Sequence, residues 1–248
     1  MCAALRAIVH RELAGAFATP VASLYLAAFT AAAGLLAFQL GGILESGRAD
    51  LAPFFQFHAW LFVVFAPALA MLTWVDELRA GTLETLLALP VPIGVQVLAK
   101  FLAGWVLAGL ALLVTVPVWI AVAVIGPVDH GAVLVGYLGS FLMAGALLAL
   151  AGAFSAATSS QVGAFVGALL AGFLLTSAGL PVVTETVRGL FGPGAGEAVA
   201  LVSVLDHLEG FHRGVIEARS LVYFLSFIAL CLLATAALVE QRRAGKLR

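Results

Sequence analysis

The chain has 248 residues, of which 63% are hydrophobic and only 10% are charged. A soluble domain is about half apolar and about a quarter charged, so this composition excludes an ordinary water-soluble fold. The formal net charge of −1 gives no basis for binding nucleic acid or another polyanion. We therefore predict a single all-α integral membrane domain over residues 1–248.

Near the N-terminus, charged residues interrupt the apolar ones before any uninterrupted apolar run starts. A cleavable signal peptide has a different order, so we expect no removed leader. One side of a helix over residues 5–17 would be apolar, formed by Leu5, Ile8, Val9, Leu13, Ala16 and Phe17. This pattern predicts an interfacial helix within residues 1–20 that enters the first span at Pro20, with an irregular basic tail as the alternative.

Six apolar stretches are long enough to cross a membrane, since a span needs roughly 20 mostly apolar residues. They cover residues 21–40, 54–74, 97–125, 132–157, 162–180 and 221–239. Backbone groups in hydrocarbon must be bonded within their own segment, and these runs are too continuously apolar for barrel strands. We predict six transmembrane helices, with kinks at Pro67 and Pro117.

The lysines and arginines predict that both termini are cytoplasmic. With the N-terminus inside, eight of these residues fall on the cytoplasmic side: Arg6, Arg11, Arg79, Lys100, Arg242, Arg243, Lys246 and Arg248. The other four fall outside: Arg48, Arg188, Arg213 and Arg219.

The link between the second and third spans, residues 75–92, is therefore predicted to be cytoplasmic. Its charged residues are Asp76, Glu77, Arg79 and Glu84, and its apolar face consists of Leu83, Leu86 and Leu87 before Pro90 and Pro92. Gly81 would let the chain bend, and Thr82 is a candidate helix cap. Leucines at this spacing predict an amphipathic helix that either enters a groove on another protein or rests on lipid head groups.

Small residues recur in the fourth and fifth spans. Gly163 and Gly167 form a G-x-x-x-G pair, and Gly136, Ser140, Gly145 and Gly152 mark the fourth span. Such residues let helices approach closely in a membrane. We expect Gly163 and Gly167 to serve packing within the chain, with a dimer contact as the alternative.

Residues 181–220 form a long external segment, which we predict to contain two short helices around Gly192-Pro193-Gly194. His207, Glu209 and His212 raise the question of a metal site, but the histidines would lie about 140° apart around a helix. We expect no metal there and an interfacial helix with Phe211 facing lipid. His58 and His130 are expected among the head groups.

No catalytic or cofactor-binding motif is present. The sequence lacks the G-x-x-x-x-G-K-[ST] phosphate loop, so this chain is not expected to hydrolyse ATP or to bind a cofactor itself. Residues 101–128, 131–184 and 221–239 contain no Asp, Glu, Lys, Arg or His. Ion-coupled transporters usually hold such groups at membrane depth, so their scarcity disfavours that mechanism.

Two segments resemble a known family. Glu77, Arg79, Gly81, Thr82, Glu84, Leu86, Leu87 and Pro90, followed by Lys100, resemble the E-x-R/K-x-G-T-x-E-x-L-L-x-x-P…K pattern of ABC-2 type transporter permeases. The segment GFHRGVIEARSLVYFLSF, residues 210–227, is similar to a pattern in the branch of gliding-motility and NosY-like permeases. Glu217 and Ser220 depart from that second pattern, which has aspartates at both positions.

The resemblance implies the permease subunit of an exporter in a bacterial inner membrane. Residues 75–92 would be the coupling helix, which binds a separate ATPase subunit that holds ATP and Mg²⁺. The implied contact residues are Glu77, Arg79, Gly81, Thr82, Leu83, Glu84, Leu86, Leu87 and Pro90. Further implied partners are a second copy or a homologous permease, and the region 181–220 could receive an external accessory protein. Lys100 would lie among head groups or pair with an acidic residue. No cargo is implied, and an ion-coupled carrier or channel without an ATPase is the alternative.

Overall fold

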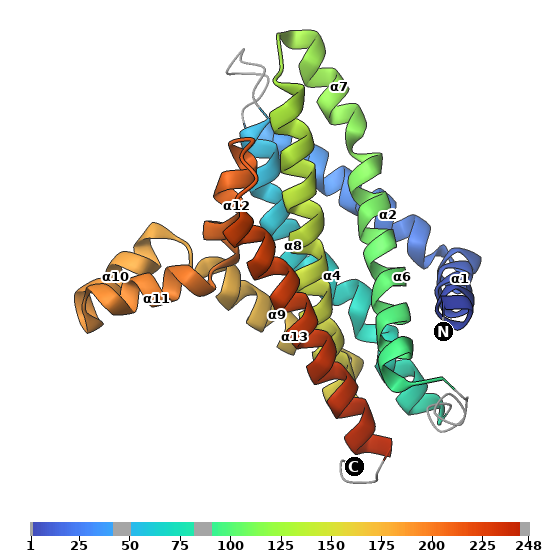
Figure 1. Ribbon diagram of the computed structural model, residues 1–248. Helices are drawn as coiled ribbons and strands as arrows, with labels where there is room; N and C mark the ends of the chain where they lie inside the picture. Colours follow the sequence, from blue (N-terminus) through green and yellow to red (C-terminus); the bar gives the residue numbers. More distant parts are fainter. Residues whose placement is uncertain (1, 42–50, 82–90, 244–248) are drawn as a thin grey trace.

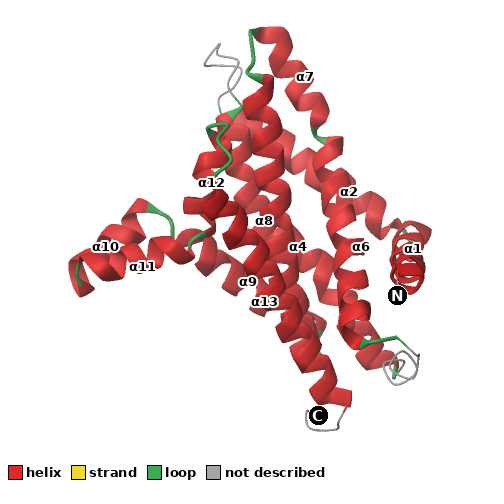
Figure 2. Cartoon of the chain, viewed as in Figure 1, coloured by secondary structure: helices red, strands yellow, loops and turns green. Residues whose placement is uncertain are grey.

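The computed structural model describes residues 2–41, 51–81 and 91–243. Figure 1 shows a long bundle of helices, with a helical pair projecting to one side. Over the described ranges the chain contains no β-strand (Figure 2). The helices are α1 (Cys2–Ala18), α2 (Pro20–Leu35) with the π-helix η1 (Leu36–Leu40), α4 (Ala52–Ala80), α6 (Ile93–Val114), α7 (Val116–Ile125), α8 (His130–Ala157), α9 (Gln161–Ser177), α10 (Pro181–Phe191), α11 (Pro193–Val202), α12 (Val204–His212) and α13 (Ala218–Arg243).

Five described stretches are long and apolar enough to cross a membrane: Pro20–Leu40, Ala52–Arg79, Ile93–Ile125, His130–Ala157 and Ala218–Arg243. The fifth predicted span differs from these, because α9 has only 17 residues and the chain bends by 77° into α10. Counting that bent pair as one span gives six. The chain is therefore an all-helical protein with the helix lengths and composition of a multi-pass membrane protein.

The third predicted span is broken at Thr115, between α6 and α7. Pro117 has no N–H to donate to the carbonyl one turn earlier, so the helical hydrogen-bond ladder is interrupted here. The Thr115 hydroxyl donates to the Leu112 carbonyl at 2.6 Å. The second predicted span, by contrast, lies in a helix that continues through Pro67.

Helix α8 is the centre of the bundle and packs against α4, α6, α9, α12 and α13. Its glycines let large side chains from these neighbours reach its backbone. A Cβ atom on Gly136 would lie 2.7 Å from the Phe55 ring, and one on Gly145 would lie 2.8 Å from Trp105. At Gly139 the added atom would lie 2.6 Å from Cβ of Phe211.

This contact makes a first prediction. Gly139→Ala should destabilise the folded protein by about 1–3 kcal/mol, because the new methyl group forces α12 away from α8. Gly152→Ala on the same helix is the matched control, since a Cβ there meets nothing within 4 Å. The control should be neutral or stabilising by up to about 1 kcal/mol. Thermal unfolding in detergent compares the two; equal melting temperatures would show that the close α8–α12 approach is not required.

The segment 181–220 contains the two predicted short helices, α10 and α11, joined at Gly192 with a φ of 91°. A third helix, α12, follows, and it is the helix that was predicted around Phe211. Its N-terminus is capped by Ser203, whose hydroxyl accepts hydrogen bonds from the N–H groups of Leu205 and Asp206. A serine before an acidic first turn is a recognisable capping signal.

The prediction that Phe211 faces lipid is wrong. Phe211 is fully buried, beside Gly139 and with its ring centroid 6.3 Å from that of Phe224. The missing side chain at Gly139 leaves the space that the phenylalanine fills.

The prediction that His58 lies among head groups is also wrong. His58 is fully buried in α4, and its Nδ1 lies 3.0 Å from the Ser140 hydroxyl of α8. Its ring is surrounded by aromatic side chains, with Phe54 the nearest at 4.3 Å between centroids. His130, by contrast, is an exposed residue at the start of α8.

Candidate functional site

The most concentrated set of charges among the described residues lies at one end of the bundle. At this end α4 finishes at Ala80, α6 begins at Ile93 and α13 finishes at Arg243 (Figure 1). We call it the Lys100 end. Arg11, Glu12, Glu77 and Lys100 meet there, and we call these four residues the Lys100 cluster.

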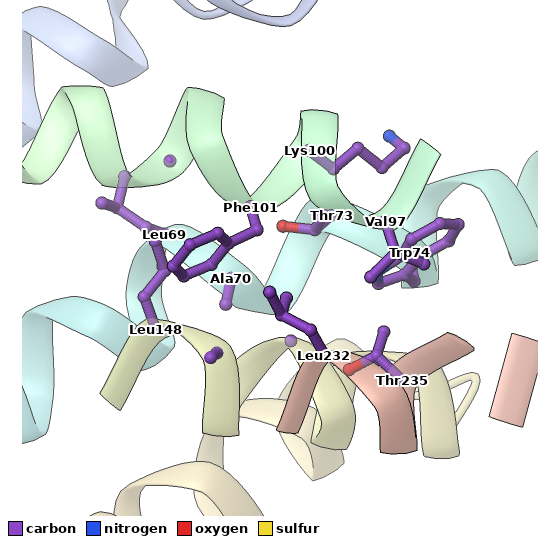
Figure 3. A pocket seen from close by; sticks show the side chains of 13 residues that line it. Leu69, Ala70, Thr73, Trp74, Val97, Lys100, Phe101, Leu148, Leu232 and Thr235 are labelled. Atoms are coloured by element: carbon purple, nitrogen blue, oxygen red, sulfur yellow. The ribbon is translucent and has the colours of Figure 1, made fainter. Parts of the chain in front are cut away.

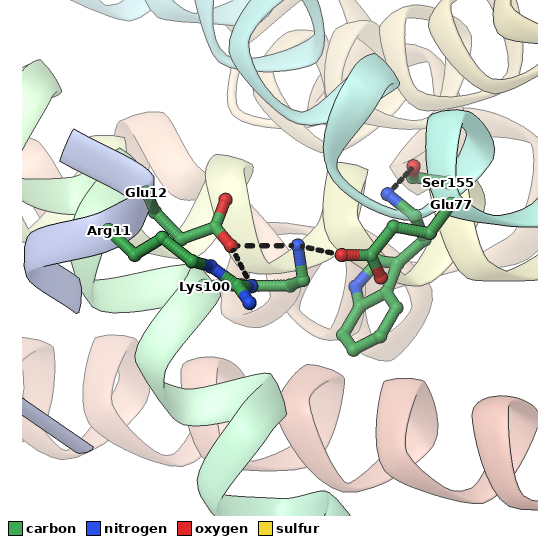
Figure 4. Close-up of polar contacts among 6 residues, drawn as sticks. Arg11, Glu12, Glu77, Lys100 and Ser155 are labelled. Atoms are coloured by element: carbon green, nitrogen blue, oxygen red, sulfur yellow. Dashed lines mark hydrogen bonds and ion pairs between the residues drawn. The ribbon is translucent and has the colours of Figure 1, made fainter. Parts of the chain in front are cut away.

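The Lys100 cluster joins three helices. Figure 4 shows the Lys100 ammonium group of α6 between the carboxylates of Glu12 from α1 and Glu77 from α4. The Lys100 Nζ atom lies 2.8 Å from Glu77 Oε1 and 3.3 Å from Glu12 Oε1. Arg11 adds a contact of 2.7 Å from its Nη2 to Glu12 Oε1. One ammonium group therefore holds the N-terminal helix and the end of α4 against α6.

The lysine of this cluster is almost completely buried, with 4% of its side chain exposed. Its Nζ atom also lies 5.4 Å from the centroid of the Trp74 ring, within the range of a cation–π interaction. A buried charge is costly unless it is paired, and the two carboxylates with Arg11 make the cluster formally neutral. Lys100 was expected either among head groups or paired with an acidic residue, and the structure confirms the pairing.

The pKa of Glu12 reports this environment. Burial disfavours the ionised carboxylate, but the Lys100 ammonium group and Arg11 outweigh burial, so the pKa lies below its ordinary value of 4.5. Because the pKa is lower in the folded state than in the unfolded state, the ionised carboxylate stabilises the fold at pH values above the unfolded-state pKa. That stabilisation is lost as the pH falls through the folded-state pKa.

We therefore expect the wild-type melting temperature to exceed that of Glu12→Gln at pH 7, and the difference to shrink below about pH 4.5. The amide has nearly the shape of the carboxylate but cannot ionise. Comparing the two proteins at each pH removes the contribution of the other carboxyl groups. A difference that stays constant down to about pH 3 would contradict the ionic role of Glu12.

Further polar contacts link the end of α4 to α8 and α9. Arg79 Nε donates to the Ser159 carbonyl at 3.0 Å, and Gln161 Nε2 donates to Asp76 Oδ1 at 2.7 Å. The backbone N–H of Trp74 donates to the Ser155 hydroxyl at 3.2 Å.

The C-terminal helix joins the same region. In α13, Arg242 Nε donates to the Ala156 carbonyl at 2.8 Å. The ends of α4, α8, α9 and α13 are thus bonded to one another.

The predicted coupling residues divide into two groups. Glu77 and Arg79 belong to the last turn of α4, which continues beyond the predicted end of the second span. Gly81 ends that helix with a φ of 65°, and its N–H donates to the Glu77 carbonyl. This left-handed conformation favours glycine. The other predicted residues lie outside the described ranges: Thr82, Leu83, Glu84, Leu86, Leu87 and Pro90.

The chain returns to the described part at Val91. Pro92 precedes α6, and the Gln96 side chain donates to the Val91 carbonyl at 3.1 Å. Lys100 follows Gln96 one turn later on the same helix. Both sides of the segment 82–90 are therefore held close to the Lys100 cluster.

A small cavity of about 30 Å³ lies beside Lys100, between α4, α6, α8 and α13. Figure 3 shows its wall, to which Thr73, Trp74 and Lys100 contribute on one side and Leu148 and Leu232 on the other. The volume suits one or two water molecules and is far smaller than a site for an organic ligand.

The two glycines of the G-x-x-x-G pair have different surroundings. A Cβ atom on Gly167 would lie 2.8 Å from the Phe154 ring of α8, so this glycine permits a close approach within the chain. The atoms nearest to a Cβ on Gly163 would be those of Ser160 and Thr158, which belong to the turn before its own helix.

The two histidines of α12, His207 and His212, have structural partners. His207 stacks on Tyr223 at 3.9 Å between centroids, and its ring nitrogens lie 3.4 Å from the Ser220 hydroxyl and 3.1 Å from the Leu201 carbonyl. His212 stacks on Phe55. Burial lowers the pKa of His212 to about 4. Within the described ranges, no group of three or more His, Cys, Asp or Glu residues is arranged to hold a metal ion.

The sequence pointed to Glu77 and Lys100 as site residues, but it did not predict that Lys100 also pairs with Glu12. A lysine inside an apolar helix needs a carboxylate partner, so the sequence does predict an ion pair for Lys100. The choice among Glu12, Asp76, Glu77 and Glu84 depends on how α1 crosses α6, which no local pattern encodes.

A scan against protein-family models gives no match, and a search of the curated proteins gives none either.

Proposed function

We propose that this chain is the membrane-spanning permease subunit of an ATP-driven exporter, and that a separate ATPase subunit binds its segment 82–90. The observation that carries the proposal is the Lys100 cluster, because it joins three helices at the two ends of that segment. A force applied to the segment would pass directly into α1, α4 and α6.

The connections of α4 extend this route. Arg79 bonds to the link between α8 and α9, and Asp76 bonds to the first residue of α9, so a displacement of the α4 end would also reach the central helix α8. The Arg79 and Asp76 contacts are exposed, whereas the Lys100 ammonium group that pairs with Glu77 is buried, so this ion pair is the stiffer part of the route. Such stiffness suits a lever between a motor and the spans.

The segment itself has the features of a binding helix. Leu83, Leu86 and Leu87 form the apolar face expected to enter a groove on the ATPase, and Glu84 lies among them for a polar contact. Gly81 ends α4 sharply, so a helix that follows it would leave the direction of the span. The bilayer, both termini on the ATPase side and a second permease copy complete the proposed assembly.

The test is transport by the purified permease and ATPase in sealed vesicles, using labelled candidate cargoes. The proposal expects uptake that requires ATP and stops when the ATPase carries a substitution in its phosphate-loop lysine. Transport by the permease alone, driven by an imposed ion gradient, would instead establish a secondary carrier.

A further inference from the structure

Helix α1 exposes all of its basic side chains. Arg6, His10 and Arg11 are exposed, and we call the surface that they form the basic face of α1. Arg11 remains 53% exposed in its contact with Glu12, and within the described ranges Arg6 and His10 have no ion pair. The one acidic residue of α1, Glu12, is half-buried and pairs with Lys100. The exposed charge of this helix is therefore positive.

The apolar side of α1 is turned toward the bundle, because the helix packs against α6 and α2. Glu12 lies near the middle of this side, so its ion pair with Lys100 fixes the rotation of α1 about its axis. An amphipathic helix that lies alone on a membrane turns its apolar side to the lipid. Here α6 takes that side, and the basic face is left to meet the surroundings. The half-buried apolar residues are Leu5, Ile8, Val9, Leu13 and Ala16.

The place of α1 along the bundle sets the depth of the basic face. Lys100 follows Ile93, the first residue of α6, by seven positions, so α1 contacts α6 roughly 10 Å from the start of that helix. Figure 1 shows α1 beside α6, whereas the C-terminal end of α13 reaches further along the bundle at this end. Interfacial helices lie about 5–10 Å into the boundary between head groups and acyl chains. The basic face is therefore at head-group depth, on the side of the bundle rather than below its end.

An exposed aromatic residue adjoins the basic face. Phe17 is 49% exposed and lies within about 40° of Arg6 and His10 around the helix. The apolar exposure continues into α2, where Val21 is 50% and Leu24 71% exposed. Basic groups next to exposed apolar groups match the edge of a lipid leaflet, where phosphates lie beside acyl chains. An acidic protein surface would pair with the arginines but would leave the apolar groups without a partner.

We propose that the basic face of α1 binds the phosphate groups of anionic phospholipids in the leaflet at the Lys100 end. Each guanidinium group of Arg6 and Arg11 has five N–H donors, and guanidinium pairs with phosphate through two parallel hydrogen bonds. A zwitterionic lipid also carries an ammonium group, which the arginines repel, so anionic lipids are preferred. Because Lys100 holds α1 through Glu12, the lipid site belongs to the folded protein.

Photo-cross-linking tests the proposal on this chain alone, so the result does not depend on any ATPase. The protein is reconstituted in phosphatidylcholine vesicles that contain a small fraction of one probe lipid. The probe is either phosphatidylglycerol or phosphatidylcholine, each with a photoactivatable diazirine close to the head group. After illumination, peptide mass spectrometry measures the yield of each probe on α1.

We expect a higher yield from the phosphatidylglycerol probe than from the phosphatidylcholine probe. In the variant with Arg6→Gln and Arg11→Gln, the ratio of the two yields should fall about fivefold for each arginine replaced, because each basic residue at a membrane surface contributes that much to the binding of anionic lipid. Arg213→Gln with Arg219→Gln is the matched control, since it removes two exposed arginines from the other end of the bundle. The control should keep the wild-type ratio on α1.

Equal yields of the two probes on wild-type α1 would overturn the proposal. A preference for phosphatidylglycerol that survives Arg6→Gln with Arg11→Gln would overturn it as well. If neither probe labels α1, the basic face is covered by water or by a protein surface, and the proposal is also wrong. The same size-exclusion profile as the wild-type protein confirms that each variant is folded.

Discussion

Replacing Lys100 with methionine is expected to destabilise the folded protein by about 3 kcal/mol. Methionine keeps the length and apolar stem of the side chain but removes the charge that pairs Glu12 with Glu77. Two carboxylates would then remain in a partly buried site without their common partner. Because both retain some exposure to solvent, the loss falls at the low end of that known for broken buried ion pairs. The melting temperature should fall by roughly 6–12 °C.

Arg11→Met is the matched control, since it also removes one positive charge from the cluster. Its guanidinium group is exposed, and such contacts contribute at most about 1 kcal/mol. A double variant that adds Glu77→Gln to Lys100→Met should recover part of the lost stability, because it removes one of the two carboxylates that have lost the Lys100 charge. If Lys100→Met and Arg11→Met have equal effects, or if the double variant is additive, the ionic connection between α4 and α6 is not significant.

Replacing Leu86 and Leu87 together with aspartate is expected to abolish co-purification of the ATPase. Two carboxylates cannot enter an apolar groove without losing their hydration, so the proposed contact should fail completely. Pull-down of the detergent-solubilised complex through a tag on the permease gives the measurement.

The control for this pair is Leu86→Met with Leu87→Met, which keeps the apolar face and should retain the ATPase. Membrane insertion and the size-exclusion profile should be the same for both double variants. An unchanged complex with the aspartate variant would mean that these leucines rest on lipid head groups, the second interpretation of their pattern.

The sequence predicted the helical class and the positions of the apolar stretches well, because length and hydrophobicity decide both. The break at Pro117 is likewise a local property of the chain. The 77° bend after α9 is different, since residues 162–180 are apolar throughout and Pro181 only permits a new helix to start. Composition alone does not say where a short span stops.

Residues whose position depends on a partner helix were the ones placed wrongly. Phe211 lies in an amphipathic segment and would face lipid by its own pattern, but Gly139 on α8 provides the space that it fills. His58 is polar and near a span end, yet Ser140 and the surrounding rings hold it inside. The identity of Glu12 as a partner of Lys100 was not predicted for the same reason, because the pair joins residues 88 positions apart.

The sidedness of the segment 82–90 is decisive for the proposed function, because an ATPase is restricted to the side that holds ATP. In a variant with Thr82→Cys, and with Cys2 and Cys231 replaced, we expect a membrane-impermeant maleimide to label the protein only after the cells are permeabilised. Labelling of Thr82→Cys in intact cells would put the segment on the external side, and no ATP-driven motor could reach it there.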